Sequence, residues 1–590
     1  MLGVDNICPA GLFAIDLGMR HLISGESDLA LCGGVSSHGP LRQVYFAKMG
    51  ALSPSGDVRA FDENADGTAF SDGAAVVALK LLDRALLDGN EVLGILIGFG
   101  GASDGSGKAI FAPRTEGQTA AMRRALAVNN LNPSRVGWVV AHGTATLAGD
   151  STESRSLAAV YPRGIDVTSD KSIGGHTGMA CGVVSVIQVL NGLRRMTVPG
   201  QQRFAAAPRH APSAVHVSPL DHPLRSTGEQ MPTGGATSPS HIAGAFACGL
   251  GGINAHLLVQ HPGGSTTGLV SGPARGTEEA VLVGWNALLP GNLTREEIRD
   301  RLLNGRPPAN QQFFDDPYPL PPFEESRVSP SVARQVDRLQ LMALSLVHSS
   351  LRNSSAAWQG LHRRTGAFGA HDGPTQLAAD STLRCFRSRL QRHLANSSEE
   401  EACEKFFSAQ AERSSPVGPY TLAGRMPSVA LGWIANRYDL HGPTMMLDCG
   451  PASGLAAVHV AADHLRSADL DVALVLGCNT ELNEEVSYLS DSSEHSAVAE
   501  GLFLLVLARS SVARHLGWPT TAVIQTSLTP STPPAPVPRP SPTYRAADGI
   551  IAILRAALQG SREPSVVTLN EGSPAITVTS CLHPPASGST

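Results

Sequence analysis

The strongest constraint on this 590-residue chain is an internal repeat. The segment from Gly11, GLFAIDLGMRHLISGESDLALCGG, aligns without a gap with GLAAVHVAADHLRSADLDVALVLG from Gly454, at a constant offset of 443 residues (454 minus 11). Each segment reads as an amphipathic helix followed by a short apolar strand. A second match pairs DGAAVVALKLL from Asp72 with EGLFLLVLARS from Glu500. The chain therefore holds two copies of one α/β fold.

The two copies are cut at different places. Asp5 in copy one has only four residues before it, whereas its counterpart Asp448 lies 168 residues (448 minus 280) after Ala280, where the opening strand AVLVGWNALLPG of copy two begins. Copy one thus lacks the strands that precede its first helix, and we expect unpaired, apolar sheet edges there. A wrongly chosen start, or a chain that is a fragment of a larger protein, would account for such an opening. A permuted fold, with the front of copy two completing copy one, is disfavoured because the copies overlap through this helix.

Changes in composition predict the boundaries between regions. A Gly/Ser/Thr/Pro-rich stretch reads as a linker, and SLTPSTPPAPVPRPSPT reads as an extended proline-rich segment. We expect copy one over residues 1–260, the linker over 261–279, copy two over 280–526, the proline-rich segment over 527–545, and a remnant of copy two with a tail over 546–590.

Composition excludes several classes of protein. Hydrophobic residues make up 42% and charged residues 16%, which suits a packed globular protein. The formal net charge of −6 argues against a nucleic-acid partner. No apolar run reaches the roughly 20 residues of a membrane helix, and the N-terminus lacks a secretory signal. Nine cysteines without a CxxC pair predict neither a disulfide framework nor a metal site. A cytoplasmic location is expected.

Cys8 is a candidate nucleophile. It lies in VDNICPAGLFAI, immediately before an apolar helix. Unpaired backbone N–H groups and the helix dipole favour a thiolate at such a position, and a thiolate can accept an acyl group. The alternative is a small buried hydrophobic residue, and the residues around Cys8 leave both interpretations open.

Two histidines and a lysine follow in motifs of their own. His142 ends the apolar strand of VVAHGTATLAGD, where it could face a cleft and transfer protons or could be purely structural. SDKSIGGHTGMACG presents Lys171 and His176 on a glycine-rich loop; a phosphate-binding loop is disfavoured because the Walker spacing is absent. The glycine cluster ACGLGGINAHLLVQ at 247–260 by itself indicates only a turn or tight packing.

Together these elements resemble the β-ketoacyl synthase family of polyketide and fatty-acid condensing enzymes. The resemblance covers nearly all of residues 3–260. It rests on VDNIC at Val4–Cys8 for the nucleophile motif, HGTAT at His142–Thr146 for HGTGT, KSIGGH at Lys171–His176 for KSxxGH, and GLGGINAH at Gly249–His256 for GFGGTNAH.

The resemblance implies a fold and a reaction. The fold is the thiolase-like layered α/β/α/β/α sandwich. Cys8 would carry the acyl chain as a thioester, while His142 and His176 would promote decarboxylation of a malonyl-type extender and stabilise the enolate oxygen. Lys171 would order the charge around them. A thiolase is disfavoured, because thiolases use a second cysteine where this chain has histidines.

The resemblance also implies contacts with substrate. Thr144 and Thr146 would contact the phosphopantetheine arm of an acyl carrier protein, which carries the substrate, and no directly bound cofactor or metal is expected. Leu250 and Asn254 are expected to bind substrate. Leu250 replaces the family's gating phenylalanine, and Pro9-Ala10-Gly11 replaces the usual serine run.

Copy two resembles the N-terminal half of the same family without its reactive residues. Pro451 stands at the counterpart of Cys8, Cys449 is two residues early, and Asn570-Glu571 falls where a histidine is expected. The pairing resembles a synthase fused to a chain-length factor, as in polyunsaturated fatty-acid synthases, and implies a dimer or pseudo-dimer of ketosynthase-like domains. The sequence thus predicts decarboxylative Claisen condensation. The alternative is an inactive fragment, scaffold or partner subunit of a larger synthase.

Overall fold

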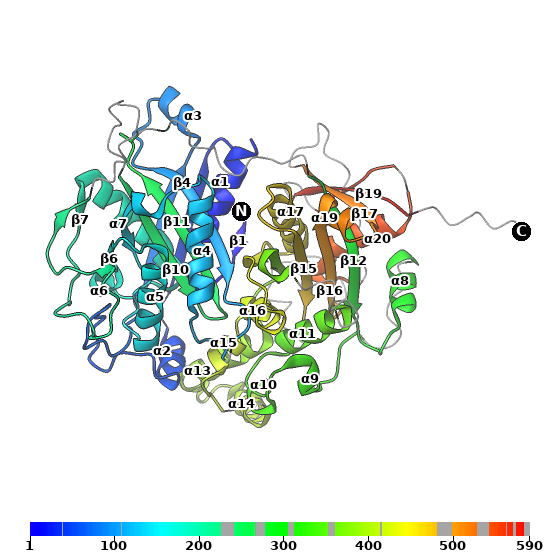
Figure 1. The fold of residues 1–590 in the computed structure, drawn as a ribbon. Helices are drawn as coiled ribbons and strands as arrows, with labels where there is room; N and C mark the ends of the chain where they lie inside the picture. Colours follow the sequence, from blue (N-terminus) through cyan, green and yellow to red (C-terminus); the bar gives the residue numbers. More distant parts are fainter. Residues whose placement is uncertain are drawn as a thin grey trace, which may run out of the picture.

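The computed structural model describes most of the chain, in ranges separated by short gaps. The described residues are 1–37, 39–107, 109–225, 241–264, 266, 278–304, 312–351, 360–413, 416–480, 498–527, 542–561, 563–569 and 574–582. Most of the expected linker and proline-rich segment, and the Asn570-Glu571 pair, lie outside them. Two α/β bodies stand side by side, with the N-terminal strand between them (Figure 1).

Copy one is built on a mixed sheet of six strands. Their order is β4 (Ile95–Ser103), β11 (Ile253–Gln260), β10 (Ile242–Gly249), β5 (Val136–Val140), β6 (Ile165–Thr168) and β8 (Val215–His216). All five residues of β5 are buried, because helices cover both faces of the sheet. Trp138 and Val140 face α1 (Ala10–Ile23) and α7 (Cys181–Arg195), whereas Val139 faces α4 (Thr115–Ala127) and α5 (Leu147–Val160).

Copy two is built on a sheet of nine strands. Their order is β1 (Gly3–Val4), β14 (Thr444–Asp448), β13 (Thr365–Ala370), β15 (Val472–Asn479), β16 (Gly501–Arg509), β12 (Ala280–Leu288), β17 (Ala522–Ser527), β19 (Ala575–Ser580) and β18 (Ser565–Val567). Helices α17 (Ser453–Arg466) and α20 (Asp548–Leu558) cover one face, and α11 (Arg338–Leu351) and α16 (Pro427–Tyr438) cover the other. These layers confirm the predicted α/β sandwich.

The copies meet through equivalent strands. Gly3 and Val4 pair antiparallel with Asp448 and Leu447, and the sequence offset makes β1 the counterpart of residues in β14. The buried side chain of Asn6 extends the contact, donating to the carbonyl of Thr444 at 2.8 Å. Antiparallel pairing of one element with its own counterpart is the geometry of a twofold dimer. The chain thus has a dimer-like arrangement within itself.

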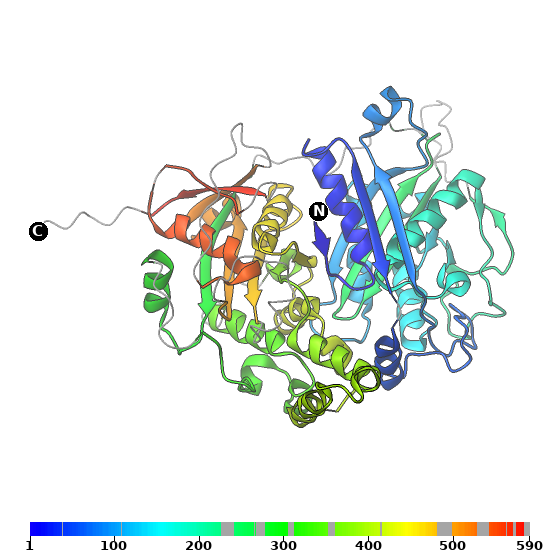
Figure 2. The same ribbon diagram turned by 180° about the vertical axis from the view of Figure 1, so that it is seen from behind.

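Strands β2 (Ala30–Ser36) and β3 (Gly73–Leu79) form a separate two-stranded antiparallel sheet. Within the described ranges, neither strand pairs with any other. One face of this two-stranded sheet packs against α1 and α7 (Figure 2, blue strands beside the blue helix). On the opposite face Leu31, Val35 and Val76 are 71%, 71% and 61% exposed. The expected unpaired, apolar edges of copy one are therefore seen within the described residues, and no described strand of copy two pairs with them.

Among the helices that the structure describes, none has both the length and the apolar character needed to cross a bilayer.

Candidate active site

Cys8 lies in a tight turn between β1 and α1. The residue before it, Ile7, adopts φ +58°, a left-handed conformation that is strained for a β-branched residue. The loop between β10 and β11 packs against this turn, since a Cβ on Gly249 would approach the Cδ of Pro9 to 2.9 Å. Copy two repeats the turn at Gly450, the counterpart of Ile7, with φ +60°. The turn holds the half-buried Cys8 thiol at the head of the helix.

His176 faces the thiol directly. Its Nε2 lies 3.3 Å from Cys8 Sγ, and its Nδ1 accepts a hydrogen bond from the backbone N–H of Gly178 at 3.2 Å. In the neutral ring this second bond leaves the proton on Nε2, which then points at the sulfur. Phe70 stacks on the imidazole with ring centroids 4.9 Å apart. His176 is thus positioned as a hydrogen-bond donor at the reacting centre.

His142 completes the cluster at the end of β5. Its ring centroid is 5.3 Å from that of His176 at an angle of 85°, and donor atoms of Cys8, His142 and His176 all lie within 4.8 Å of one another. Glu153 fixes the backbone by accepting bonds from the N–H groups of His142 and Gly143 at 2.7 and 2.8 Å. Burial, the Lys171 charge and His176 hold the pKa of His142 well below its usual value, so the ring is neutral.

Lys171 is a completely buried cation beside this cluster. Burial disfavours its charge, but Asp170, 3.4 Å away, together with the charges of Cys181, Glu153 and Cys8, outweighs the burial and raises the pKa of Lys171. The pKa of the Cys8 thiol is lowered. A hydrogen bond with the Cys181 thiol is the main cause; burial opposes it, and the charges of Lys171 and Arg42 support it. The site therefore favours a thiolate at Cys8.

Thr144 and Thr146 lie on the turn after His142. Their hydroxyl oxygens are 3.0 Å apart and half-buried. Asp150 shapes the turn by accepting a hydrogen bond from the N–H of Ala145 at 3.0 Å. The predicted contact of both threonines with a pantetheine arm stays a prediction.

Leu250 lies in the glycine-rich loop between β10 and β11, and Asn254 lies at the start of β11. Leu250 is half-buried and packs in the same apolar cluster as Ile7 and Cys8. Asn254 is 1% exposed and donates to Asp104 Oδ1 at 2.8 Å, so it anchors the loop. Their roles in binding substrate stay predictions.

Sequence reasoning missed two residues that tune the thiol, Cys181 and Arg42. Cys181 begins α7, ten residues after Lys171 (181 minus 171), and its thiol donates to the Cys8 carbonyl at 3.4 Å. Its place just after the KSIGGH loop was the available signal. Arg42 gave no such signal, because it comes from α2 (Pro40–Lys48), far from every motif.

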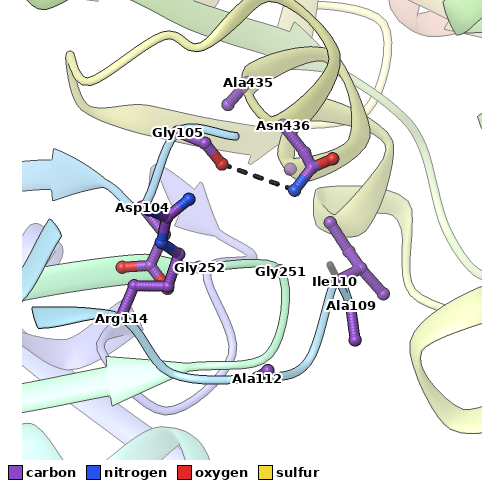
Figure 3. A pocket seen from close by; sticks show the side chains of 11 residues that line it. Asp104, Gly105, Ala109, Ile110, Ala112, Arg114, Gly251, Gly252, Ala435 and Asn436 are labelled. Atoms are coloured by element: carbon purple, nitrogen blue, oxygen red, sulfur yellow. Dashed lines mark hydrogen bonds between the residues drawn. The ribbon is translucent and has the colours of Figure 1, made fainter. Parts of the chain in front are cut away.

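A pocket lies between the copies, beside the loop that carries Leu250 (Figure 3). Copy one contributes Gly251 and Gly105, and helix α16 of copy two contributes Gly432 and Asn436. The Asn436 amide donates to the Gly105 carbonyl at 3.4 Å, drawn as the dashed line in Figure 3. A Cβ on Gly432 would lie 2.6 Å from the Gly251 oxygen. Copy two therefore touches the loop next to Cys8.

At the position equivalent to Cys8, copy two has Pro451 and so no thiol. Cys449 nearby has its pKa raised, mainly by burial.

Comparison with known proteins agrees with this geometry. The N-terminal domain of β-ketoacyl synthases matches residues 1–85 and 309–500, and the C-terminal domain matches 93–205. These matches together cover more than half of the chain. The chain belongs to the β-ketoacyl synthase family.

Curated relatives and a solved structure fit this assignment. The chain is 35% identical over 266 residues to a phenolphthiocerol/phthiocerol polyketide synthase protein of Mycobacterium bovis, which covers 44% of the chain and 14% of that protein. It is 36% identical over 265 residues to the phthioceranic/hydroxyphthioceranic acid synthase of Mycobacterium tuberculosis, covering 44% and 12%. The structure titled as a PfaC keto synthase–chain length factor superposes with a TM-score of 0.75 at 17% identity, over 99% of this chain and 72% of that one. The last likeness concerns the fold alone.

Proposed function

We propose that this β-ketoacyl synthase catalyses decarboxylative Claisen condensation in polyketide or fatty-acid synthesis. Cys8 would hold the growing acyl chain as a thioester. The observation that carries the proposal is the triangle of Cys8, His142 and His176, whose donor atoms lie within 4.8 Å of one another. A buried, charged Lys171 next to it supports the thiolate, and burial together with this charge lowers the pKa of His142.

The first step transfers the acyl chain. The Cys8 thiolate attacks the acyl thioester, a new C–S bond forms, and the carrier thiolate leaves and takes a proton from solvent. The Nε2–H group of His176, 3.3 Å from the sulfur, orients the thiolate for this attack.

The second step forms the carbon–carbon bond. The malonyl-type thioester loses CO₂, and the electron pair of the broken bond becomes an enolate whose oxygen accepts hydrogen bonds from His142 and His176. The enolate carbon then attacks the Cys8 thioester carbonyl, the C–S bond breaks, and the thiolate is regenerated. A neutral His142 suits this role, because it donates a hydrogen bond without protonating the carbanion.

Copy two is proposed as a non-catalytic partner that shapes the acyl site. It has Pro451 in place of a reactive cysteine, and Gly432 of α16 packs against Gly251 in the loop that carries Leu250. An acyl carrier protein would deliver both substrates past Thr144 and Thr146.

A second candidate is an inactive partner subunit of a larger synthase. The exposed apolar face at Leu31, Val35 and Val76 favours it, because such patches mark interaction surfaces.

The deciding experiment is the mass of the Cys8 peptide after incubation with an acyl-phosphopantetheine thioester. We expect an acyl adduct that is absent in Cys8→Ala and retained in Cys449→Ala, the matched control from copy two. A folded protein without the adduct on Cys8 would favour the inactive partner instead.

A further inference from the structure

A second cluster of metal-ligating side chains lies away from the active site, where the central helices of the two copies meet. His21 lies in the last turn of helix α1, Glu26 follows shortly after the helix ends at Ile23, and His459 comes from α17 of copy two. We propose that His21, Glu26 and His459 bind one divalent transition-metal ion, with Zn²⁺ the best match, and thereby join the two copies.

The distances suit a metal centre. His21 Nδ1 lies 2.8 Å from Glu26 Oε2, and His459 Nε2 lies 3.7 Å from Glu26 Oε1. The two imidazoles stack with centroids 5.9 Å apart, and one donor atom from each residue lies within 4.8 Å of the others. Zinc bonds of about 2.0–2.2 Å need only small side-chain shifts from this arrangement.

His459 supplies an independent indication of a ligand. The residue is 3% exposed, yet neither of its ring nitrogens has a hydrogen-bond partner among the described residues. Buried polar atoms are normally satisfied, so such a ring calls for a bound group.

The repeat itself offers a control site. At the offset of 443, His464 and Asp469 are the counterparts of His21 and Glu26, and they lie 3.2 Å apart. There a guanidinium neutralises the carboxylate: Arg20 lies 2.7 Å from Asp469 and 3.0 Å from Asp16.

The proposed centre has different residues at these two positions. The counterpart of Arg20 is Asp463, which pairs with Arg466, and the counterpart of Asp16 is His459. The proposed centre therefore has an imidazole, His459, where the counterpart site has the Asp16 carboxylate, and its additional carboxylate, Asp463, already pairs with Arg466.

The ligand types select the metal. Two imidazoles with one carboxylate suit Zn²⁺, Co²⁺ or Ni²⁺ rather than Mg²⁺ or Ca²⁺, which prefer oxygen ligands. The His21 side chain is 30% exposed, so an ion can enter from solvent and keep water as its fourth ligand.

The test uses the full chain carrying Cys8→Ala, so that the thiol of the active-site triangle cannot bind metal. Chelator-treated protein is titrated with Co²⁺, followed by its visible d–d absorption, and with Zn²⁺ by calorimetry. We expect one ion per chain. His21→Asn and His459→Asn should each weaken binding by more than about 100-fold, because the loss of even an outer-shell partner costs 10–100-fold.

The matched control is His464→Asn, which alters the counterpart cluster and should leave Co²⁺ binding unchanged. His21→Asn is the safer variant for folding, because this side chain is partly exposed. The absence of stoichiometric binding, or equal binding by the parent and the folded His21→Asn protein, would overturn the proposal. Neither readout depends on acyl transfer, so the proposed function can fail or hold independently.

Discussion

The strand pair β2–β3 of copy one and the strand pair β15–β16 of copy two are the same structural unit in two environments. Their pairing registers coincide: Leu31 faces Ala78 as Leu474 faces Val506, and the offsets of 443 and 428 residues (500 minus 72) relate the two pairs. Their burial differs completely. Leu31 is 71% exposed and Leu474 is 0% exposed.

The difference comes from what surrounds each pair. In copy two, β13 and β12 pair with both edges, and α11 and α16 cover the face that holds Leu474. Copy one offers none of these neighbours within its described residues. Its exposed face also has smaller side chains, with Ala74 and Ala78 where copy two has Leu502 and Val506. The two copies thus share the strand pair and its register, while the tertiary context decides how deeply the strand pair is buried.

The largest expected effect comes from placing a charge in each environment. Leu504→Lys would bury an unpaired ammonium and should cost about 3–5 kcal/mol. At the counterpart, Val76→Lys projects into solvent and should change stability by no more than about 0.5 kcal/mol. Thermal unfolding midpoints of the two variants check this. A large loss from Val76→Lys would mean that this face is covered in solution.

The catalytic difference between the copies can be tested next. His176→Ala removes a donor to the enolate oxygen and should slow decarboxylation by about 10²–10³-fold, as loss of one oxyanion donor does. The measurement is CO₂ release from a malonyl-phosphopantetheine thioester. A rate within a few-fold of the parent would contradict the assigned role.

Introducing a thiol into copy two sharpens the same point. Pro451→Cys in a Cys8→Ala background should give no acyl adduct, because the described residues of copy two place no histidine pair or buried lysine at that turn. Peptide mass spectrometry checks this, and labelling at position 451 would show that the turn alone activates a thiol.

The two native thiols near these turns should differ in pH dependence. The lowered pKa of Cys8 makes its alkylation begin at lower pH than that of Cys449, whose pKa burial raises. Arg42→Gln should shift the Cys8 profile to higher pH and leave that of Cys449 unchanged. Iodoacetamide labelling at several pH values, read by peptide mass, tests both. Coincident profiles would contradict the electrostatic account.

The smallest expected effect concerns the contact between the copies. Gly432→Ala places a Cβ 2.6 Å from the Gly251 oxygen and should shift the Leu250 loop slightly. We expect up to about a 10-fold loss in kcat/KM, equivalent to about 1.4 kcal/mol, with the loss increasing for longer acyl chains. Kinetics with a series of acyl lengths measure it, and a uniform loss would place the pocket outside the acyl path.

Much of the fold was predictable from the repeat. The helix–strand units from Gly11 and Gly454, and the strands that follow Asp72 and Glu500, all form where the periodicity places them. Resemblance supplied the active-site triangle, which single residues left undecided. The sequence could not reveal that the charge of Arg42 acts on Cys8, because α2 and the Cys8 turn come together only in the folded chain.

The histidine–glutamate cluster escaped sequence reasoning for a similar reason. Glu26 and His459 are 433 residues apart (459 minus 26), and no ligand spacing links them. Only the packing of α1 against copy two brings them together.

The pairing of β1 with β14 has a consequence for synthesis. A growing chain reaches Asp448 only 445 residues (448 minus 3) after Gly3, which takes roughly 20–90 s at 5–20 residues per second. Until then, the strand leading to Cys8 has no partner, and Asn6 lacks the Thr444 carbonyl to which it donates. The turn that holds Cys8 therefore reaches its final form late, after most of the chain has been synthesised.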